Sequence, residues 1–241
     1  MINLIKVKNY DEASDKAFEI IKEYLKPGKV LGLATGSTPL GLYARMVKDH
    51  EENKTSYTDI KTFNLDEYVG LPITHPQSYY AFMYKNLFNH IDIKDENVHI
   101  PCGIGDDIEL KAQQYDEMID ENPVDIQILG IGSDGHIAFN EPGTSFDSLT
   151  HITDLAESTI QDNCRFFKND ISKVPTQAVT QGIATIMKAK NILLIATGEN
   201  KAKAIKEMLE GEINENCPAS ILRNHDNVTV ILDEDAASLL S

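Results

Sequence analysis

Cysteine is scarce in this chain of 241 residues, and the three that occur, Cys102, Cys164 and Cys217, lie far apart in the sequence. They show no C-x-x-C spacing, and one of them must stay unpaired because their number is odd. Such usage is typical of proteins that work in a reducing compartment, so we expect a cytoplasmic protein without structural disulfides.

Basic residues are also few, since 22 Lys and Arg stand against 38 Asp and Glu and give a formal net charge of −16. Binding to DNA, RNA or an anionic membrane requires clustered cations, and this balance disfavours all three partners. A small phosphorylated substrate is still possible, because a few local donors suffice to hold one phosphate.

Long apolar runs are absent: none approaches the ~18 residues that a membrane-spanning helix needs. The N-terminal segment MINLIKVKNYDEASDK is charged within its first six residues and lacks the apolar core of a signal peptide. Internal repeats, low-complexity tracts and Ser/Gly-rich linkers are missing too. We therefore predict a single domain over residues 1–241, long enough to bury its core without cross-links.

Short apolar runs rich in Val and Ile alternate with amphipathic segments. Helical spacing and terminal Pro or Gly residues predict helices over residues 10–25, 39–50, 78–89, 107–121 and 199–210. The predicted strands are 30–34, 60–65, 97–100, 124–131, 190–196 and 228–232, while 177–189 is ambiguous and reads as an approach segment plus a helix. Apolar strands that alternate with helices indicate a Rossmann-like α/β fold, with a mostly parallel sheet covered by helices on both faces. In such folds the site lies beyond the carboxyl ends of the strands.

The loop ATGSTP at residues 34–39 follows the first of these strands and precedes a helix. Its backbone N–H groups and two hydroxyls make Gly36, Ser37 and Thr38 candidate phosphate ligands. It is not a P-loop, because no Gly-Lys-Ser/Thr follows, and an ordinary capped turn explains the loop alone equally well.

Lys201, in ATGENK, is a further candidate phosphate ligand, since a cation in the first turn of a helix is unfavourable unless an anion binds nearby. A solvated surface lysine is the alternative.

Two adjacent carboxylates follow the strand at 60–65 in the segment TFNLDEY. Side chains alternate in an extended chain, so Asp66 and Glu67 are expected to face different sides, with Asp66 on the side of Asn64. A carboxylate at the end of a strand is a candidate general base. A turn acid or helix-capping acid is the alternative.

The segment GIGSDGHIAFNEP at residues 130–142 is the most informative. Its G-x-G-x-x-G pattern suggests a dinucleotide site, but HIAFNEPGTSFD lacks the helical periodicity that this fingerprint needs. Ser133 lacks the G-x-S-x-G context of a hydrolase nucleophile, and no recognisable metal-ligand spacing occurs. A carboxylate beside an imidazole raises its basicity, so His136 is a candidate proton shuttle, with Asp134 and Glu141 close in the sequence.

Together these segments resemble glucosamine-6-phosphate deaminases, also called isomerases. The resemblance rests on LGLATGSTPLGLY, TFNLDEYVGL, HPQSYYAFM, GIGSDGHIAFNEPGTSF and ATGENKAKAI, in order from about residue 3 to about residue 233. It implies an aldose–ketose isomerisation with deamination, in which glucosamine 6-phosphate and water give fructose 6-phosphate and ammonia. It implies neither a metal nor a redox cofactor, and no partner other than the sugar phosphate; the chain is expected to act as a monomer or a small homo-oligomer.

The resemblance also implies a role for each candidate residue. His136 would open the sugar ring by moving a proton from the C1 hydroxyl to the ring oxygen, with support from Asp134 and Glu141. Asp66 would take the proton from C2 and return it to C1. The phosphate would be held by Gly36, Ser37, Thr38, Arg165 and Lys201.

Residues 145–178 carry few strong helix or strand signals and contain Arg165. We expect this segment to be a lid that closes over the sugar and excludes water. A closing lid would bring Arg165 to the phosphate, where the fork of its guanidinium group suits bidentate contact.

The sequence departs from the usual pattern of this family in two places, and two other functions are alternatives to the one that the resemblance implies. Ser37 stands where many members have Gly. Longer members, which N-acetylglucosamine 6-phosphate activates, carry an Arg and a Lys at the positions of His151 and Thr153, so we expect no such activation here. A 6-phosphogluconolactonase shares the fold and a GxGxDGH loop but lacks the DEY and FNEP segments. A non-catalytic sugar-phosphate sensor is expected to lose a catalytic side chain, and here all four candidates are present.

Overall fold

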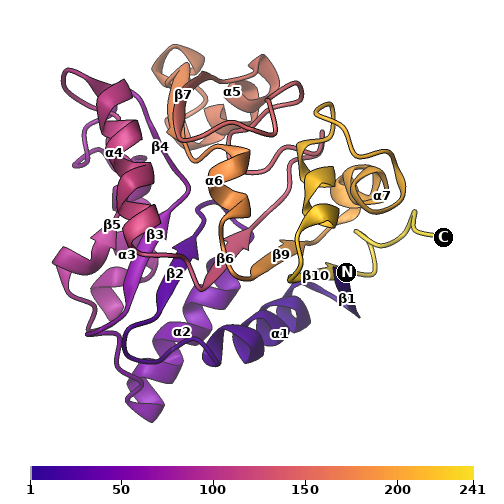
Figure 1. Ribbon diagram of the computed structural model, residues 1–241, viewed down its shortest axis with the longest axis horizontal. Helices are drawn as coiled ribbons and strands as arrows, with labels where there is room; N and C mark the ends of the chain where they lie inside the picture. Colours follow the sequence, from indigo (N-terminus) through magenta and orange to yellow (C-terminus); the bar gives the residue numbers. More distant parts are fainter. Residues whose placement is uncertain (1) are drawn as a thin grey trace.

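The computed structural model describes residues 2–241, except for the side chains of residues 158 and 162, and places a seven-stranded sheet at the centre of the molecule (Figure 1). Every neighbouring pair of its strands is parallel, which confirms the expected Rossmann-like sheet. In spatial order the strands are β1 (Ile2–Val7), β10 (Val228–Asp233), β9 (Ile192–Ala196), β6 (Ile126–Leu129), β2 (Val30–Leu33), β3 (Lys61–Asn64) and β5 (Val98–His99).

Helices cover both faces of this sheet (Figure 1). One face packs on α1 (Tyr10–Lys22), α2 (Leu40–Asn53) and α3 (Tyr79–Asn86); the other packs on α4 (Ile108–Glu121), α6 (Ile183–Met187) and α7 (Ala202–Glu210). Successive strand residues point to opposite faces, so Leu193 and Ile195 join the first core whereas Ile192 and Leu194 join the second. Burial on both faces is the reason that these strands are apolar throughout.

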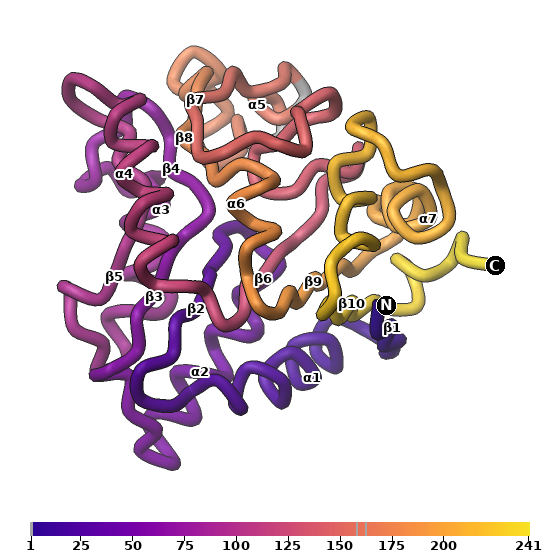
Figure 2. Tube along the Cα trace, in the orientation of Figure 1, coloured from indigo at the N-terminus to yellow at the C-terminus, as the bar shows by residue number. Residues whose placement is uncertain are grey.

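A second, three-stranded antiparallel sheet lies beside the first, in the order β4 (Asp66–Tyr68), β8 (Gln177–Thr180) and β7 (His151–Asp154) (Figure 2). Between β7 and β8 lie α5 (Glu157–Cys164) and the short 3₁₀ turns η3 (Arg165–Phe167) and η4 (Ile171–Lys173). A third apolar cluster joins this segment to the rest of the fold, with Leu155, Phe167 and Val174 on one side and Tyr68 and Phe139 on the other.

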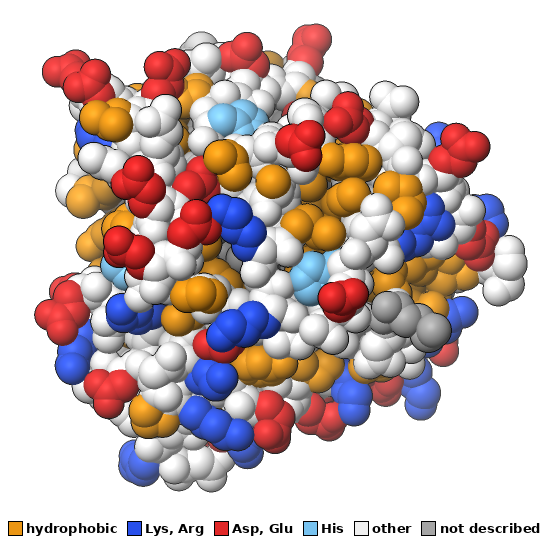
Figure 3. All heavy atoms as spheres, viewed as in Figure 1, with side chains coloured by type: hydrophobic (Ala, Val, Ile, Leu, Met, Phe, Trp, Pro, Cys, Tyr) orange, Lys and Arg blue, Asp and Glu red, His pale blue; other side chains and the backbone are white. Residues whose placement is uncertain are grey.

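The remaining short elements are all 3₁₀ turns: η1 (Phe88–His90), η2 (Asp95–Asn97), η5 (Glu199–Lys201) and η6 (Pro218–Asn224). Side-chain caps set the starts of two helices: Asn9 accepts a hydrogen bond from the N–H of Glu12 at α1, and Ser78 accepts one from the N–H of Ala81 at α3. No helix in the described part of the chain has the length and apolar character to cross a membrane. Asp and Glu side chains, interspersed with Lys and Arg, lie over much of the face in Figure 3.

Several expectations about elements were wrong in detail. The strand expected at 124–131 spans only Ile126–Leu129, and the one expected at 97–100 is only two residues long. The ambiguous region 177–189 divides into β8 and α6. The edge strand β1 was not predicted, because its residues are half-buried or exposed without a regular alternation and include Lys6.

Residues 145–178, which carry few strong helix or strand signals, nevertheless form regular structure. The segment contains β7, α5 and two 3₁₀ turns. Its strand HITD is polar and mostly half-exposed, and pairs only along β8, so hydrophobic periodicity could not reveal it.

Candidate active site

The candidate site lies where the strand order of the large sheet reverses. From β2 the chain moves outward through β3 to β5, whereas from β6 it moves the other way through β9 to β10. Ligands bind in the crevice at such a switch point, beyond the carboxyl ends of the strands. The loops that leave β2 and β6 meet there, because a Cβ atom built on Gly130 would lie 3.5 Å from Oγ1 of Thr38.

Residues 34–39, the anion loop, connect β2 to the N-terminus of α2. The buried hydroxyl of Tyr43 holds the start of this loop: it accepts a hydrogen bond from the N–H of Ala34 at 3.2 Å and donates one to the carbonyl of Ala34 at 2.5 Å. Gly36 has a φ of +87°, a left-handed conformation that favours glycine. Among the hydrogen bonds of the described residues, none takes up the N–H groups of residues 36–38. These donors at the start of a helix are available to an anion.

The loop after β6 carries the imidazole of His136. Its Nδ1 lies 2.7 Å from Oδ1 of Asp134 and 3.4 Å from Oε2 of Glu141, so both carboxylates approach the same ring nitrogen. Burial lowers the pKa of His136, but the hydrogen bond and charge of Asp134, together with those of Glu141, outweigh it and raise the pKa to about 9. The hydrogen bond from His136 in turn holds the pKa of Asp134 below its usual range. The imidazole is therefore charged at neutral pH, with Nε2 left for a ligand.

The glycines at positions 130, 132 and 135, whose spacing resembles a dinucleotide fingerprint, do not precede a helix here. A Cβ atom on Gly132 would lie 2.3 Å from the ring of His136, and one on Gly135, whose φ is +88°, would lie 2.7 Å from Sγ of Cys217. No helix occurs between residues 130 and 150, all of which the structure describes. The glycines therefore make room for the imidazole and for a tight turn, in place of a helix N-terminus that binds pyrophosphate.

Glu141 is held from a distant segment. Thr159, on α5, donates a hydrogen bond from its hydroxyl to Oε1 of Glu141 at 2.8 Å, while Oε2 faces the imidazole. The sequence gives no sign of this contact, because the two residues belong to separate segments and a threonine in an amphipathic helix carries no signal of its own. The segment predicted to be a lid thus touches the site through α5.

Asp66 and Glu67 are neighbours in β4 with unlike surroundings. The Glu67 carboxylate accepts hydrogen bonds from the backbone N–H groups of Tyr68, Tyr79 and Tyr80 at 2.8–2.9 Å and so caps the start of α3. Asp66 is 6% exposed, and no hydrogen bond among the described residues ends on its carboxylate. Burial raises the pKa of Asp66 to about 8, with a further increase from the charge of Glu67 and a decrease from that of His136. Asp66 is therefore a base of increased strength that lies within electrostatic reach of His136.

The aromatic rings of Tyr68, Tyr79 and Phe139 pack together between the anion loop, β4 and the loop after β6, and this cluster was not predicted. Tyr79 lies parallel to Phe139, with ring centroids 6.1 Å apart, and 4.8 Å from the ring of Tyr68. The side chain of Tyr79 also lies close to that of Thr35 in the anion loop. Its position in HPQSYYAFM contributed only to the family resemblance.

The two candidate cations lie on different elements. Lys201 ends η5, directly after β9, and so belongs to the same edge of the sheet as the anion loop. Arg165 begins η3, is exposed, and its guanidinium carbon lies 4.7 Å from the ring centroid of Phe166. Contact of either side chain with a phosphate remains a prediction.

The Asp134, His136 and Glu141 cluster could also hold a metal ion, since its potential ligand atoms all lie within 4.8 Å of one another. A metal would need the lone pair of an imidazole nitrogen. The raised pKa of His136 instead favours a proton on the ring, where the positive charge lies beside both carboxylates. Proton transfer is thus the chemistry that this arrangement supports best.

Comparison with known proteins gives the same family at every level. The family model of glucosamine-6-phosphate isomerases and 6-phosphogluconolactonases matches residues 10–231. A glucosamine-6-phosphate deaminase of Streptococcus uberis is 53% identical over 240 residues, which are 99% of this chain and 100% of that protein. One from Thermoanaerobacter sp. is 51% identical over 235 residues, 96% of this chain and 92% of its own.

Solved structures divide into near and distant relatives. A monomeric glucosamine-6-phosphate deaminase has a TM-score of 0.95 and 45% identity, covering 98% of this chain and 99% of its own. A 6-phosphogluconolactonase from Trypanosoma brucei has a TM-score of 0.78 and 22% identity, covering 100% of this chain and 99% of its own, a likeness of fold alone.

Proposed function

This chain belongs to the family of glucosamine-6-phosphate isomerases and 6-phosphogluconolactonases, and we infer that it is a glucosamine-6-phosphate deaminase. As an enzyme of amino sugar metabolism, it converts glucosamine 6-phosphate and water to fructose 6-phosphate and ammonia. The observation that carries this conclusion is the identity of 53% over 240 residues to a deaminase, against 22% to a lactonase that shares the fold.

We propose that the phosphate binds first, at the anion loop. The free N–H groups of Gly36, Ser37 and Thr38 supply neutral donors at the positive end of α2. Lys201 and Arg165 supply the charge, and the arginine arrives when the lid segment closes. This arrangement concentrates positive potential at one point of a chain whose net charge is −16.

Ring opening follows at His136. The imidazolium donates a proton from Nε2 to the ring oxygen and then takes one from the C1 hydroxyl, so that the C1–O5 bond breaks and an aldehyde forms. Asp134 and Glu141 support this role because they hold the ring through Nδ1 and stabilise its positive charge. Their position at one nitrogen leaves the other free to face the sugar.

Proton transfer between carbons follows at Asp66. The carboxylate removes the proton from C2, and the electron pair of that C–H bond forms a C1=C2 double bond as the aldehyde oxygen gains a proton. When the proton returns to C1, the nitrogen lone pair forms a C2=N double bond and leaves an iminium ion at C2. Water hydrolyses this ion to the ketone and releases ammonia in its protonated form. Burial strengthens the base and provides a low-dielectric site for this step.

The segment 145–178 serves as the lid in this proposal. The hydrogen bond between Thr159 and Glu141 supports this role of the segment. Movement of α5 would change the position of Glu141, the carboxylate that helps to hold the imidazole. We further propose that the enzyme works in the cytoplasm as a monomer or small homo-oligomer. Its three free cysteines and the monomeric solved relative support this.

The test is ammonia release from glucosamine 6-phosphate by the purified protein, measured with and without a chelator. We expect turnover in both cases and no hydrolysis of 6-phosphogluconolactone. Absence of ammonia, or hydrolysis of the lactone in its place, would refute the proposed function. Activity that disappears with the chelator and returns with a metal would show that the Asp134 cluster holds an ion.

A further inference from the structure

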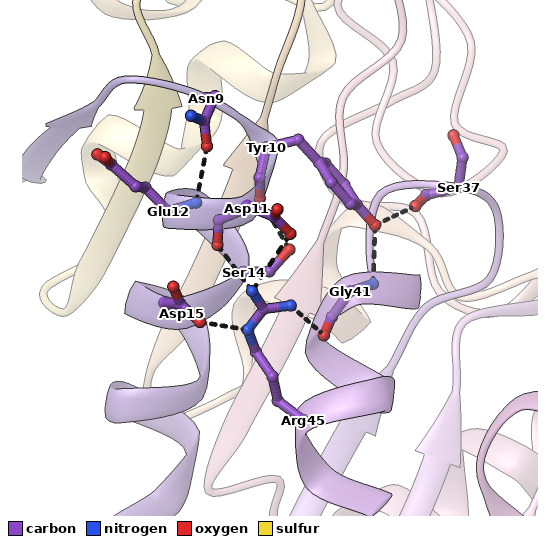
Figure 4. Close-up of polar contacts among 9 residues, drawn as sticks. All are labelled: Asn9, Tyr10, Asp11, Glu12, Ser14, Asp15, Ser37, Gly41 and Arg45. Atoms are coloured by element: carbon purple, nitrogen blue, oxygen red, sulfur yellow. Dashed lines mark hydrogen bonds and ion pairs between the residues drawn. The ribbon is translucent and has the colours of Figure 1, made fainter. Parts of the chain in front are cut away.

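The anion loop is held at its far end by a residue from another helix. The hydroxyl of Tyr10, the first residue of α1, donates a hydrogen bond to the carbonyl of Ser37 at 2.9 Å and accepts one from the N–H of Gly41 at 2.7 Å (Figure 4). One side chain thus joins the loop to the first turn of α2. Together with Tyr43 at Ala34, it fixes both ends of the loop and leaves Thr35 and Gly36 between them.

The bond to Ser37, beside a longer one from the N–H of Leu40 at 3.4 Å, also determines where the next N–H group points. The peptide bond between Ser37 and Thr38 is trans, as are the others in the described chain, so its C=O and N–H point in opposite directions. With the carbonyl drawn toward α1, the N–H of Thr38 is directed away from it. Thr38 itself lies against the loop after β6, on the side of the switch point.

Tyr10 is in turn held rigidly by the packing of α1 on α2. Figure 4 shows the guanidinium group of Arg45 between the helices, where it donates to the side chain of Asp15, to the carbonyl of Gly41 at 2.9 Å and to the carbonyl of Asp11 at 3.1 Å. A Cβ atom on Gly41 would lie 2.2 Å from Oγ of Ser14 and 3.1 Å from the ring of Tyr10. Glycine at position 41 therefore permits the approach that the hydroxyl needs.

We propose that Tyr10 is a positioning residue for phosphate recognition: its hydroxyl orients the Ser37–Thr38 peptide so that the N–H of Thr38 faces the anion. The inference rests on the proposed phosphate site and adds a determinant of affinity that does not touch the substrate. Its effect is confined to ground-state binding, because the phosphate is remote from the carbons that react.

The experiment measures KM for glucosamine 6-phosphate, kcat, and the competitive inhibition constant of inorganic phosphate in Tyr10→Phe. This variant keeps the ring and removes only the hydroxyl. We expect KM and the phosphate inhibition constant to rise together by about three- to tenfold, the usual effect of one lost hydrogen bond, with kcat changed less than about twofold. Tyr84→Phe is the matched control, since it removes a hydroxyl that donates to Asp95 at 2.9 Å, and it should leave all three constants unchanged.

Two further variants separate positioning from packing. Arg45→Lys loosens the contact between α1 and α2 without removing the hydroxyl, so we expect a lower melting temperature and a smaller rise in the inhibition constant than in Tyr10→Phe. Gly41→Ala improves the helix propensity of α2 but places a methyl group 2.2 Å from Oγ of Ser14 and 3.1 Å from the ring of Tyr10. The start of α1, which carries Tyr10, must then move away, so we expect weaker phosphate binding while the hydroxyl itself is kept.

The outcomes are distinct. If the unmodified enzyme releases no ammonia, the proposed function fails. If it does, and both Tyr10→Phe and Gly41→Ala bind phosphate as well as the unmodified enzyme, the role of Tyr10 is overturned. An equal weakening in Arg45→Lys overturns it too, because helix packing would then explain the effect.

Discussion

At the scale of single residues, Asp66 and Glu67 acquire opposite roles from their surroundings. The Glu67 carboxylate accepts hydrogen bonds from three backbone N–H groups. The Asp66 carboxylate is buried and accepts no hydrogen bond from the described residues. Asp66→Asn removes the base but keeps the shape of the side chain. We expect a loss of about 10²–10⁴ in kcat with little change in substrate binding, measured by steady-state kinetics.

Glu67→Gln is the control for this prediction. The amide still offers one oxygen to the N-terminus of α3 but loses the charge, so we expect a lower melting temperature and a much smaller loss of kcat. A kcat near that of the unmodified enzyme in Asp66→Asn would show that another group removes the C2 proton.

The role of His136 in ring opening predicts a dependence on the form of the substrate. His136→Gln removes the proton shuttle, so we expect a large loss of kcat with the cyclic substrate and a smaller loss with an analogue locked in the open-chain form. The measurement is the ratio of the two rates in the variant and in the unmodified enzyme. Equal losses on both substrates would assign His136 to a different step.

The pH dependence of kcat/KM is expected to report the titration of both Asp66 and His136. Asp66 acts when ionised, so the rate should rise as the pH passes about 8, and His136 acts when charged, so the rate should fall as the pH passes about 9. Asp134→Asn removes the main cause of the raised pKa of His136. We expect the alkaline limb of the profile to move to lower pH by about 1–3 units. If the alkaline limb does not move in this variant, the limb does not report the titration of the His136 imidazole.

At the scale of elements, the loop after β6 depends on glycine at one position for steric reasons. Gly132→Ala places a methyl group 2.3 Å from the present position of the His136 ring, which must then leave its two carboxylates. A displacement of about 1 Å costs roughly 10²-fold in rate, and we expect a loss of kcat of this order. Steady-state kinetics beside a melting curve measure the two effects.

Gly143→Ala is the matched control in the same region. Its φ of +93° makes alanine strained, yet no atom lies within 4 Å of the added methyl group. We expect a melting temperature lower by a few degrees, since each kcal/mol corresponds to about 2–4 °C in a chain of this size, with kcat retained. Equal losses of kcat in both variants would point to general disruption of the loop.

At the scale of the whole molecule, regulation requires a second site and two states that bind its ligand unequally. In the longer, activated members of the family, cations past the NEP segment belong to that site. Here the corresponding strand β7 carries His151 and Thr153, followed by Asp154. Thr153 has no charge, and the carboxylate beside it repels a phosphate.

We therefore expect hyperbolic velocity curves that N-acetylglucosamine 6-phosphate does not alter, except as a weak competitor. Initial velocities across a range of substrate concentrations, with and without this compound, are the measurement. Sigmoidal curves that it converts to hyperbolic ones would reveal an effector site elsewhere in the protein.

Local patterns in the sequence determined most of the large sheet and the position of the candidate site. Runs such as ILLIA at β9 are apolar on both faces, and only a sheet covered on both sides buries them completely. The alternation of strands and helices then determines parallel pairing, which brings the loops after β2, β6 and β9 to one edge. For this reason the anion loop and the loop of His136 could be identified without coordinates.

Tertiary structure alone decided the contacts between distant segments. The strands β4 and β7 are three and four residues long, and both pair through β8, so neither could be predicted from its own residues. Thr159 meets Glu141, and Tyr10 meets Ser37, only because separate helices pack at the same edge of the sheet. Such hydrogen bonds leave no periodicity in the sequence, since each depends on one side chain at one place in the packed fold.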